Sequence, residues 1–197
     1  MSERPYHHGN LRTALLAQAE RTVRERGVQE LSLRELARET GVSHGAPRRH
    51  FADRQALLDA LAEAGFERLG DELRAAVEGA GEDFPARLQA TAAAYIRFAT
   101  ADAALLELMF AGKHREPSGA LNAAAERAFA VLFELIEQGQ AQGALQAGEP
   151  ERVGLVLFAT IQGIAALLAG GMVGPEQIDG LIADAIAHFL RGSRVPA

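Results

Sequence analysis

The segment 32–51 constrains the fold most, because it predicts two short helices joined by a sharp turn. Ser32 and Glu35 form an S-x-x-E pattern, the capping box that starts a helix. Gly41 is expected to end that helix, since glycine readily adopts the left-handed backbone of a tight turn. A further short helix is expected from Ser43, as its N-cap, to about His50. The segment is therefore predicted to be a helix-turn-helix.

The rest of the chain also predicts helices, because alanine, leucine, glutamate and arginine dominate and β-branched runs are rare. A first helix is expected from Asn10, as its N-cap, to about Arg26, and Gly27 ends it. Asp53 is expected to cap a long helix over roughly 54–78. Glycine and proline separate the remaining helical segments, which are expected at about 85–100, 102–111, 118–141, 150–170 and 175–191.

The charge is unevenly distributed along the chain. Residues 1–54 carry ten arginines against seven acidic residues, a net of +3, which leaves −9 for the rest of a chain whose total is −6. Four of the six histidines also lie in the first part. A small basic head on an acidic body is the pattern expected of a protein that meets nucleic acid with one domain.

The composition favours a globular cytoplasmic protein. Hydrophobic residues make up 48% of the chain, and the absence of cysteine excludes disulfides and thiolate chemistry. The most apolar stretch, 153–173, is interrupted by Gln162 and several glycines, and the first ten residues lack the apolar core of a signal peptide. We therefore expect no membrane segment, and neither a cofactor nor a bound metal.

The second helix of the motif carries residue types that suit DNA. Small or polar residues at its start would let the backbone approach base edges in the major groove, and the basic residues behind them suit phosphates. A hairpin inside an ordinary helical bundle would show the same periodicity, but the basic cluster favours DNA. The residues expected to contact DNA are Arg34, Ser43, His44, Gly45, Ala46, Arg48, Arg49, His50 and Arg54.

Residues 10–66 resemble the N-terminal domain of the tetracycline-repressor-like (TetR) family. The resemblance implies that the third helix enters the major groove, and that the body behind it binds a ligand and dimerises. Arg48 stands where relatives usually carry an aromatic residue, most often tyrosine, and Arg54 stands where they often carry lysine. Pro47 occurs in one branch of the family. The matching residues are Leu33, Glu35-Leu36-Ala37, Gly41-Val42-Ser43, His50-Phe51 and Ala56-Leu57-Leu58.

The C-terminal half is similar to the WHG-type regulatory domain of the same family. The similarity lies in the stretch 95–99 and in Leu108-Met109-Phe110. Phe158, Gln162 and Gly163 stand at the places of the signature Trp, His and Gly, so two of the three are replaced. Together the patterns predict an all-α protein of about nine helices. Residues 1–53 would form a three-helix DNA-binding domain, and residues 54–197 a helical ligand-binding and dimerisation domain.

The last two predicted helices are the best candidates for a dimer interface. The helix over 150–170 is apolar almost all round, which calls for burial on every side. Gly154, Gly163 and Ala165 would let a partner helix approach closely. Packing within one protomer is the alternative, but one head reads too few base pairs for tight binding. The expected interface residues are Val153, Leu157, Ile164, Leu168, Ile178, Leu181, Ile182, Ile186 and Phe189.

A ligand cavity in the body is also expected, although each of its residues taken singly suits an ordinary core. Tyr95 and Gln162 are the more informative members, because buried polar groups need partners and a ligand can supply one. Ligand binding would then tilt the helix over 54–78 and change the separation of the two DNA-reading helices. The expected lining residues are Phe66, Leu69, Leu73, Tyr95, Phe98, Met109, Phe110, Phe129, Phe133, Phe158 and Gln162.

Two other classes of protein are open at the level of sequence. An enzyme is disfavoured, because no nucleophile–base pattern, glycine-rich phosphate loop or paired-carboxylate motif is present. A helical protein-interaction module would differ in having no use for Arg48 and Arg49. His7 and His8 are weak metal ligands without a third, so an arm near DNA is favoured. The sequence predicts a repressor that binds a palindromic DNA operator as a homodimer and responds to an unidentified small molecule.

Overall fold

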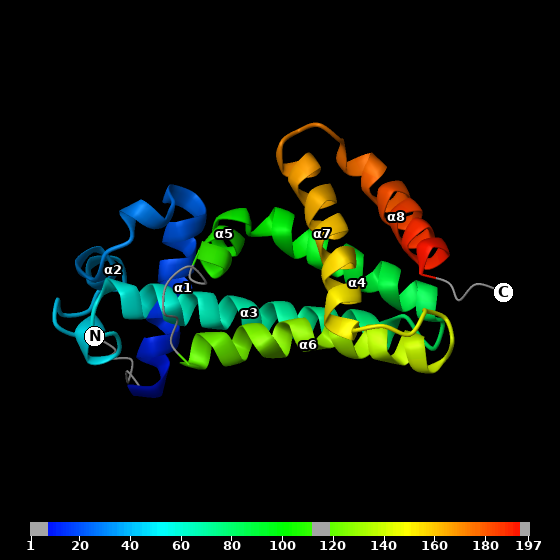
Figure 1. Cartoon of the computed structure of the whole chain (residues 1–197). Coiled ribbons are helices and arrows are strands. Elements are labelled where there is room, and N and C mark those ends of the chain that lie inside the picture. The colour runs from blue at the N-terminus through cyan, green and yellow to red at the C-terminus, as the bar shows by residue number, and fades with distance from the viewer. Residues whose placement is uncertain (1–7, 112–118, 194–197) are drawn as a thin grey trace. The chain divides into compact units, whose positions relative to one another are not determined.

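The computed structural model describes residues 8–111 and 119–193, and within them all regular structure is helical (Figure 1). The all-α prediction is confirmed, and the eight α-helices of these residues are close to the expected nine. The α-helices are α1 (His8–Arg26), α2 (Leu33–Glu39), α3 (Arg54–Gly79), α4 (Phe84–Ala101), α5 (Ala103–Ala111), α6 (Gly119–Ala141), α7 (Pro150–Ala169) and α8 (Ile178–Gly192). Short 3-10 helices are η1 (Val28–Glu30), η2 (Pro47–Arg49) and η4 (Pro175–Gln177).

The chain forms two compact units. The first unit comprises residues 1–66 and 102–124, and the second comprises residues 67–101 and 125–197. Their division falls inside α3 and not at residue 53, because α5 packs against α1 and therefore joins the first unit.

Local signals set the helix ends of the first unit much as the sequence predicts. Gly27 ends α1 with a positive φ of 84°, and its N–H donates to the Val23 carbonyl at 2.9 Å. Asp53 caps α3, since its carboxylate accepts the Ala56 N–H at 2.8 Å. Asn10 is an exception, because α1 begins two residues earlier, at His8.

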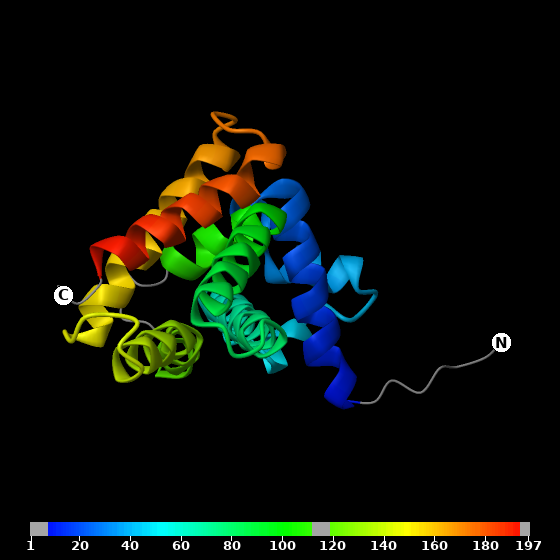
Figure 2. The same cartoon turned by 90° about the vertical axis from the view of Figure 1, so that its right-hand side faces the viewer.

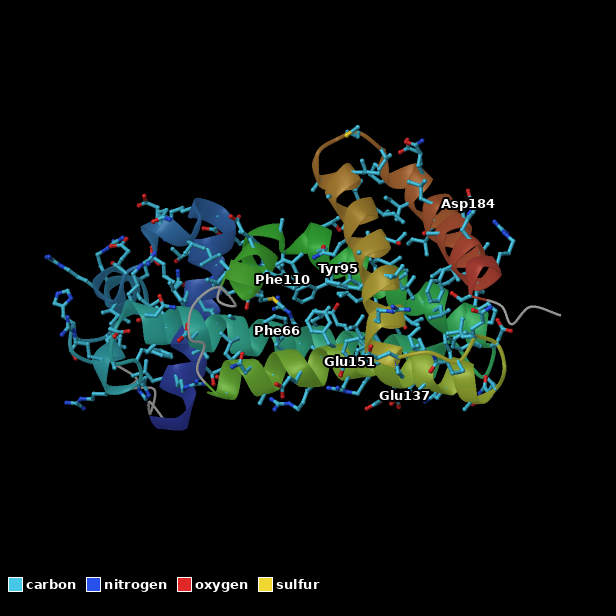
Figure 3. All side chains as sticks on the ribbon, viewed as in Figure 1. Phe66, Tyr95, Phe110, Glu137, Glu151 and Asp184 are labelled. Atoms are coloured by element: carbon cyan, nitrogen blue, oxygen red, sulfur yellow. The ribbon has the colours of Figure 1, made fainter. Side chains whose placement is uncertain are left out.

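A compact apolar core joins the elements of the first unit. The rings of Phe66 and Phe110 meet edge to face, with centroids 5.9 Å apart (Figure 3). Gly65 lies against Met109, so close that a Cβ there would be 2.7 Å from the methionine sulfur. Arg24 of α1 donates to Asp102, just before α5, at 2.7 Å. These contacts explain why α5 belongs with the N-terminal helices.

The second unit contains the later part of α3, with α4, α6, α7 and α8. Helices α7 and α8 run antiparallel, side by side, and both pack on α4 (Figures 1 and 2). Gly70 of α3 faces α6, where a Cβ would be 3.3 Å from the Cα of Ala128. Gly154 similarly admits Phe133 of α6 against α7. Small residues thus let these helices approach closely. Helix α7 is long and apolar enough to cross a membrane by length and composition alone, which is weak evidence for a membrane span.

Candidate DNA-binding surface and regulatory cavity

The turn of the helix-turn-helix is built as the sequence predicts. The Ser32 hydroxyl accepts the Glu35 N–H at 3.1 Å and so caps α2. Gly41 has a positive φ of 69°, and its N–H donates to the Arg38 carbonyl. The next N–H, of Val42, donates to the Ala37 carbonyl at 3.0 Å. This pair of bonds is a Schellman motif, which fixes the direction in which the chain leaves α2.

The short helix predicted from Ser43 to about His50 forms only in part, and it is not an α-helix. A turn over 44–46 leads into the 3-10 helix η2, and its bonds span three residues, as from the Ala46 N–H to the Ser43 carbonyl at 2.9 Å. Pro47 explains the difference, because it has no N–H to donate to Ser43 in an α-helical pattern. Instead, Pro47 is buried and its carbonyl accepts the N–H groups of His50 and Phe51.

The residues predicted to contact DNA are mostly solvent-accessible. Ser43, His44 and Gly45 are exposed, and Ala46 is half-buried behind them. The side chains of Arg48 and Arg49 are also exposed, whereas that of His50 is half-buried. Arg34 is exposed on α2. The structure therefore presents small or polar groups and two guanidinium groups on one short segment of the first unit.

Arg54 stands apart from the other predicted DNA contacts. Its guanidinium donates to the Leu31 carbonyl at 2.8 Å and to the Val28 carbonyl at 2.6 Å. These bonds hold the segment between α1 and α2 against the start of α3. The N-terminus of α3, where Arg54 lies, is capped by the Asp53 carboxylate.

A network of polar side chains fixes α2 against α1, and sequence reasoning missed it. Glu39 of α2 accepts bonds from Arg26 and, at 2.8 Å, from Gln18, both on α1. The Thr22 hydroxyl is buried beside them, 3.2 Å from the same carboxylate. The bond from Arg26 holds the pKa of Glu39 below its ordinary value, and the bond from Arg38 does the same for Glu35. No single-sequence pattern marks the bonds between α1 and α2, because they join residues far apart in the chain.

Arg12 is a second residue that sequence reasoning missed. It is exposed on α1, and its guanidinium lies 5.6 Å from the ring centroid of Phe51. Phe51 is only 2% exposed and directly follows the segment that carries Arg48 and Arg49. The cation–π contact therefore brings a further positive charge beside the predicted DNA-reading segment.

The second unit contains an apolar cavity of about 40 Å³. We call it the Tyr95 cavity. The Tyr95 hydroxyl is the one buried side-chain polar atom of the described residues that has no hydrogen-bond partner. Burial raises the pKa of Tyr95. The lining residues are Leu69, Leu73, Leu88, Thr91, Ala92, Tyr95, Ala128, Phe129, Leu132, Leu157, Phe158 and Ile161.

The lining of this cavity overlaps only in part with the residues predicted for a ligand pocket, and binding of a ligand there stays a prediction. The shared residues are Leu69, Leu73, Tyr95, Phe129 and Phe158. The other expected residues do not line it: the first unit contains Phe66, Met109 and Phe110, and the second unit contains Phe98, Phe133 and Gln162. Most of these side chains are apolar, which indicates that they pack in a core. The apolar character alone does not specify whether a residue packs around the cavity or in another part of the protein.

The residues predicted for a dimer interface divide by exposure. Five of them are buried inside the second unit and cannot form an outer face: Leu157, Ile164, Ile178, Ile182 and Ile186. The half-buried members are Val153, Leu168, Leu181 and Phe189. Gly154 and Ala165 are also buried, and only Gly163 has open space beside it. The exposed apolar residues of α7 are instead Leu155, Val156 and Leu167.

Comparison with protein families agrees with this arrangement of a helix-turn-helix and a helical body. A model described as bacterial regulatory proteins of the tetR family matches residues 15–61. A second, described as the tetracyclin repressor-like C-terminal domain, matches residues 88–189. The protein is therefore a DNA-binding transcription regulator. It belongs to the TetR family.

Solved structures of similar proteins support the same assignment. A protein of unknown function from Rhodococcus sp. RHA1 is 47% identical, with a TM-score of 0.91 over 98% of this chain and 100% of that one. The TetR-family regulator PfmR from Thermus thermophilus is 19% identical, with a TM-score of 0.68 over 93% and 99%. The fatty acid degradation regulator FadR from Bacillus halodurans is 17% identical, with a TM-score of 0.70 over 92% and 99%. The last two share the fold. A search of curated proteins found no match.

Proposed function

We propose that the protein is a homodimeric repressor that binds a palindromic DNA operator and is released from it by a small molecule. The observation that carries the proposal is the segment from Ser43 to Arg49, which follows a turn fixed by Gly41 and exposes its first three residues and its two arginines. A cytoplasmic location follows from a function on DNA.

We assign the reading of bases to the residues from Ser43 to Ala46, where short side chains permit close approach to the major groove. Arg48, Arg49 and His50 would hold phosphates, with Arg34 on the flank. Arg48 would replace by charge the backbone contact that relatives make with an aromatic residue. Arg54 would act mainly by positioning, because its guanidinium already bonds two carbonyls of its own chain.

An exposed apolar stripe on α7 supports a dimer. Leu155 is 60% exposed and Val156 is 59% exposed, and Leu167 continues the stripe about three turns further along the helix. Gly163 lies between them with open space beside it, where a second helix can approach. Burying this stripe against a second copy would place two DNA-reading segments on one assembly, about 34–36 Å apart if they enter successive major grooves.

The Tyr95 cavity supports the ligand-responsive part of the proposal. A ligand in this apolar cavity could give the buried Tyr95 hydroxyl the hydrogen-bond partner that it lacks. A ligand that binds one arrangement of α3 more tightly than another would shift the population between them. The separation of the two DNA-reading segments would change with that shift, and the operator would be released.

Selection of random DNA duplexes on the purified protein tests the proposal. We expect a palindromic site to be enriched, and its binding to weaken steeply with salt. No enrichment would instead favour a protein-interaction module. The dimer is tested by Leu155→Arg, which should yield monomers in sedimentation. The matched control is Glu137→Arg at an exposed position of α6 (Figure 3), which should leave the dimer intact.

A further inference from the structure

The walls of the Tyr95 cavity are almost entirely hydrocarbon. Helices α3, α4, α6 and α7 of the second unit all contribute side chains to them. Phe158 meets Tyr95 edge to face at 5.3 Å between centroids and Phe129 at 5.1 Å, so three aromatic rings form one continuous surface. None of the described residues that line the cavity carries a charge.

Two hydroxyl groups are the polar exceptions, and they differ in their bonding. Thr91 donates to the Arg87 carbonyl of its own helix at 2.8 Å, so its proton is already used. Tyr95 is only 4% exposed, and its hydroxyl has no partner among the described residues. A protonated phenol can donate one hydrogen bond and also accept one, and a ligand oxygen that accepts its proton would satisfy the buried group.

Water is a poor occupant for this site. A buried water molecule usually makes two to four hydrogen bonds, and about 40 Å³ would admit such a molecule by size. The described lining offers a water molecule two partners at most, the Tyr95 hydroxyl and the Thr91 oxygen, which can still accept a bond. An organic molecule with its own acceptor oxygen would satisfy the same hydroxyl and would also cover the hydrocarbon walls.

The absence of charged side chains from the lining narrows the class of ligand further. A carboxylate or phosphate in this cavity would lose its hydration with no cationic side chain of the lining to replace it. Arg68, the residue before Leu69 in sequence, is not part of the lining, and its guanidinium lies over the Phe98 ring, 5.3 Å from the centroid. The site therefore discriminates against anions.

We propose that the Tyr95 cavity binds a neutral, mainly hydrocarbon molecule with one hydrogen-bond-accepting oxygen, such as a ketone, ester or ether, and that the Tyr95 hydroxyl donates to this oxygen. The inference rests on the ligand-responsive function proposed above and specifies the ligand class for the same site.

The size of the cavity indicates how the ligand enters. Sites for organic ligands usually measure several hundred Å³, so a cavity of about 40 Å³ has to widen. Gly70 holds α3 and α6 in close backbone approach, and Gly154 holds the start of α7 against α6. Widening is therefore expected where Leu157, Phe158 and Ile161 of α7 face the cavity, beyond that anchor.

Three probes of equal chain length test the ligand class: 2-heptanone, heptanoate and heptane, each titrated into the full-length protein at neutral pH and followed by calorimetry. We expect 2-heptanone to bind at least about tenfold more tightly than heptanoate, because burying the carboxylate carries the larger cost. Tyr95→Phe should weaken 2-heptanone about fivefold, as expected for one lost hydrogen bond, and leave heptane unchanged.

Fluorescence can locate the bound probe. The chain has two tyrosines and no tryptophan, so in Tyr6→Phe the emission comes from Tyr95 alone. We expect 2-heptanone to change this emission. Ala92→Val adds two methyl groups at the cavity wall and should abolish the change, and its thermal unfolding curve checks that the variant is folded.

Three outcomes would overturn the inference. Heptanoate could bind as tightly as 2-heptanone, Tyr95→Phe could affect ketone and alkane equally, or 2-heptanone could fail to bind at millimolar concentration. Undiminished 2-heptanone binding by Ala92→Val would do so too, even if Tyr95→Phe failed to fold. None of these measurements involves DNA. If the protein enriches an operator but the probe experiments fail, only the ligand class is contradicted. If the DNA selection enriches no operator, the proposed regulatory function itself is contradicted.

Discussion

Thr22 in the first unit and Tyr95 in the second are both almost fully buried, yet their hydroxyl groups have opposite surroundings. The Thr22 hydroxyl lies 3.1 Å from the Gln18 carbonyl and 3.2 Å from the Glu39 carboxylate, either of which can accept its proton. The Tyr95 hydroxyl has no partner among the described residues. A satisfied polar network favours one arrangement of its helices, whereas an unsatisfied group favours any arrangement that brings it an acceptor.

This difference separates two tasks. The first unit has to hold the segment from Ser43 to Arg49 in one position, and the bonds of Glu39 to α1 serve that end. Under the proposed function the second unit responds to a small molecule, and the Tyr95 cavity offers both space and a hydrogen-bond donor for it. A variant in one unit should therefore affect one activity and leave the other intact.

The largest expected effect is on DNA binding. Replacing both Arg48 and Arg49 by alanine should weaken operator affinity on the order of 100-fold, because two charge-assisted phosphate contacts are lost. The slope of log affinity against log salt should become shallower by about two. Binding of 2-heptanone and the sedimentation of the dimer should not change, since both side chains are exposed in the first unit. Unchanged DNA affinity would remove these residues from the interface.

The next effect concerns the bonded hydroxyl. Thr22→Val keeps the shape of the side chain but removes a hydrogen-bond partner of Glu39, and should lower the free energy of unfolding by about 1–2 kcal/mol. Operator affinity should fall with it, because α2 loses part of its attachment to α1. Chemical denaturation measures the stability, and the titration with 2-heptanone is the control. A variant as stable as the parent would show that the network does not hold α2.

The first unit was the more predictable of the two, because its turns depend on neighbours in sequence. Ser32, Gly41 and Asp53 act within a few residues, so a capping hydroxyl or a glycine could be recognised without the fold. The same reasoning failed where two local rules competed. Ser43 suggested an α-helix, but Pro47 withholds the N–H that its carbonyl would need, and a turn with a 3-10 helix forms.

The cavity was less predictable, because it depends on how four helices meet. Tyr95 could be singled out as a polar group in an apolar setting, which is a property of its own sequence region. Phe66 has the same apolar character as Phe129, yet it packs on Phe110 in the first unit while Phe129 faces the cavity. Leu88 and Ile161, which line the cavity, carried no signal beyond helical periodicity. Contacts between distant residues therefore decided the lining.

A smaller effect is expected for the hydroxyl without a partner. Tyr95→Phe should leave the free energy of unfolding unchanged or raise it by up to about 1 kcal/mol, because an unsatisfied buried group is removed. The informative quantity is the difference between the changes in free energy of unfolding caused by Tyr95→Phe and by Thr22→Val. Both variants should therefore be unfolded under the same conditions. Destabilisation of Tyr95→Phe by as much as Thr22→Val would mean that its hydroxyl has a partner in the folded protein.

The last prediction concerns how the free energy of unfolding depends on pH. Glu39 in the first unit should matter at low pH and Tyr95 in the second unit at high pH. Because the bond from Arg26 lowers the folded-state pKa of Glu39, its stabilising contribution is present above the unfolded pKa of about 4.3 and is lost as the pH falls through the folded pKa. Burial raises the pKa of Tyr95, so its contribution is present below the unfolded pKa of about 10 and is lost as the pH rises beyond it.

Two variants separate these contributions in a series of thermal unfolding curves. The difference between Glu39→Gln and the parent should shrink as the pH falls from about 5 toward 3, since protonated Glu39 no longer attracts Arg26. Tyr95→Phe should instead lose less stability than the parent above about pH 10, since phenylalanine has no proton to release. Differences that stay constant over both ranges would mean that neither group changes its pKa on folding. The surroundings of the Glu39 carboxyl and the Tyr95 hydroxyl would then have no net electrostatic effect on either group.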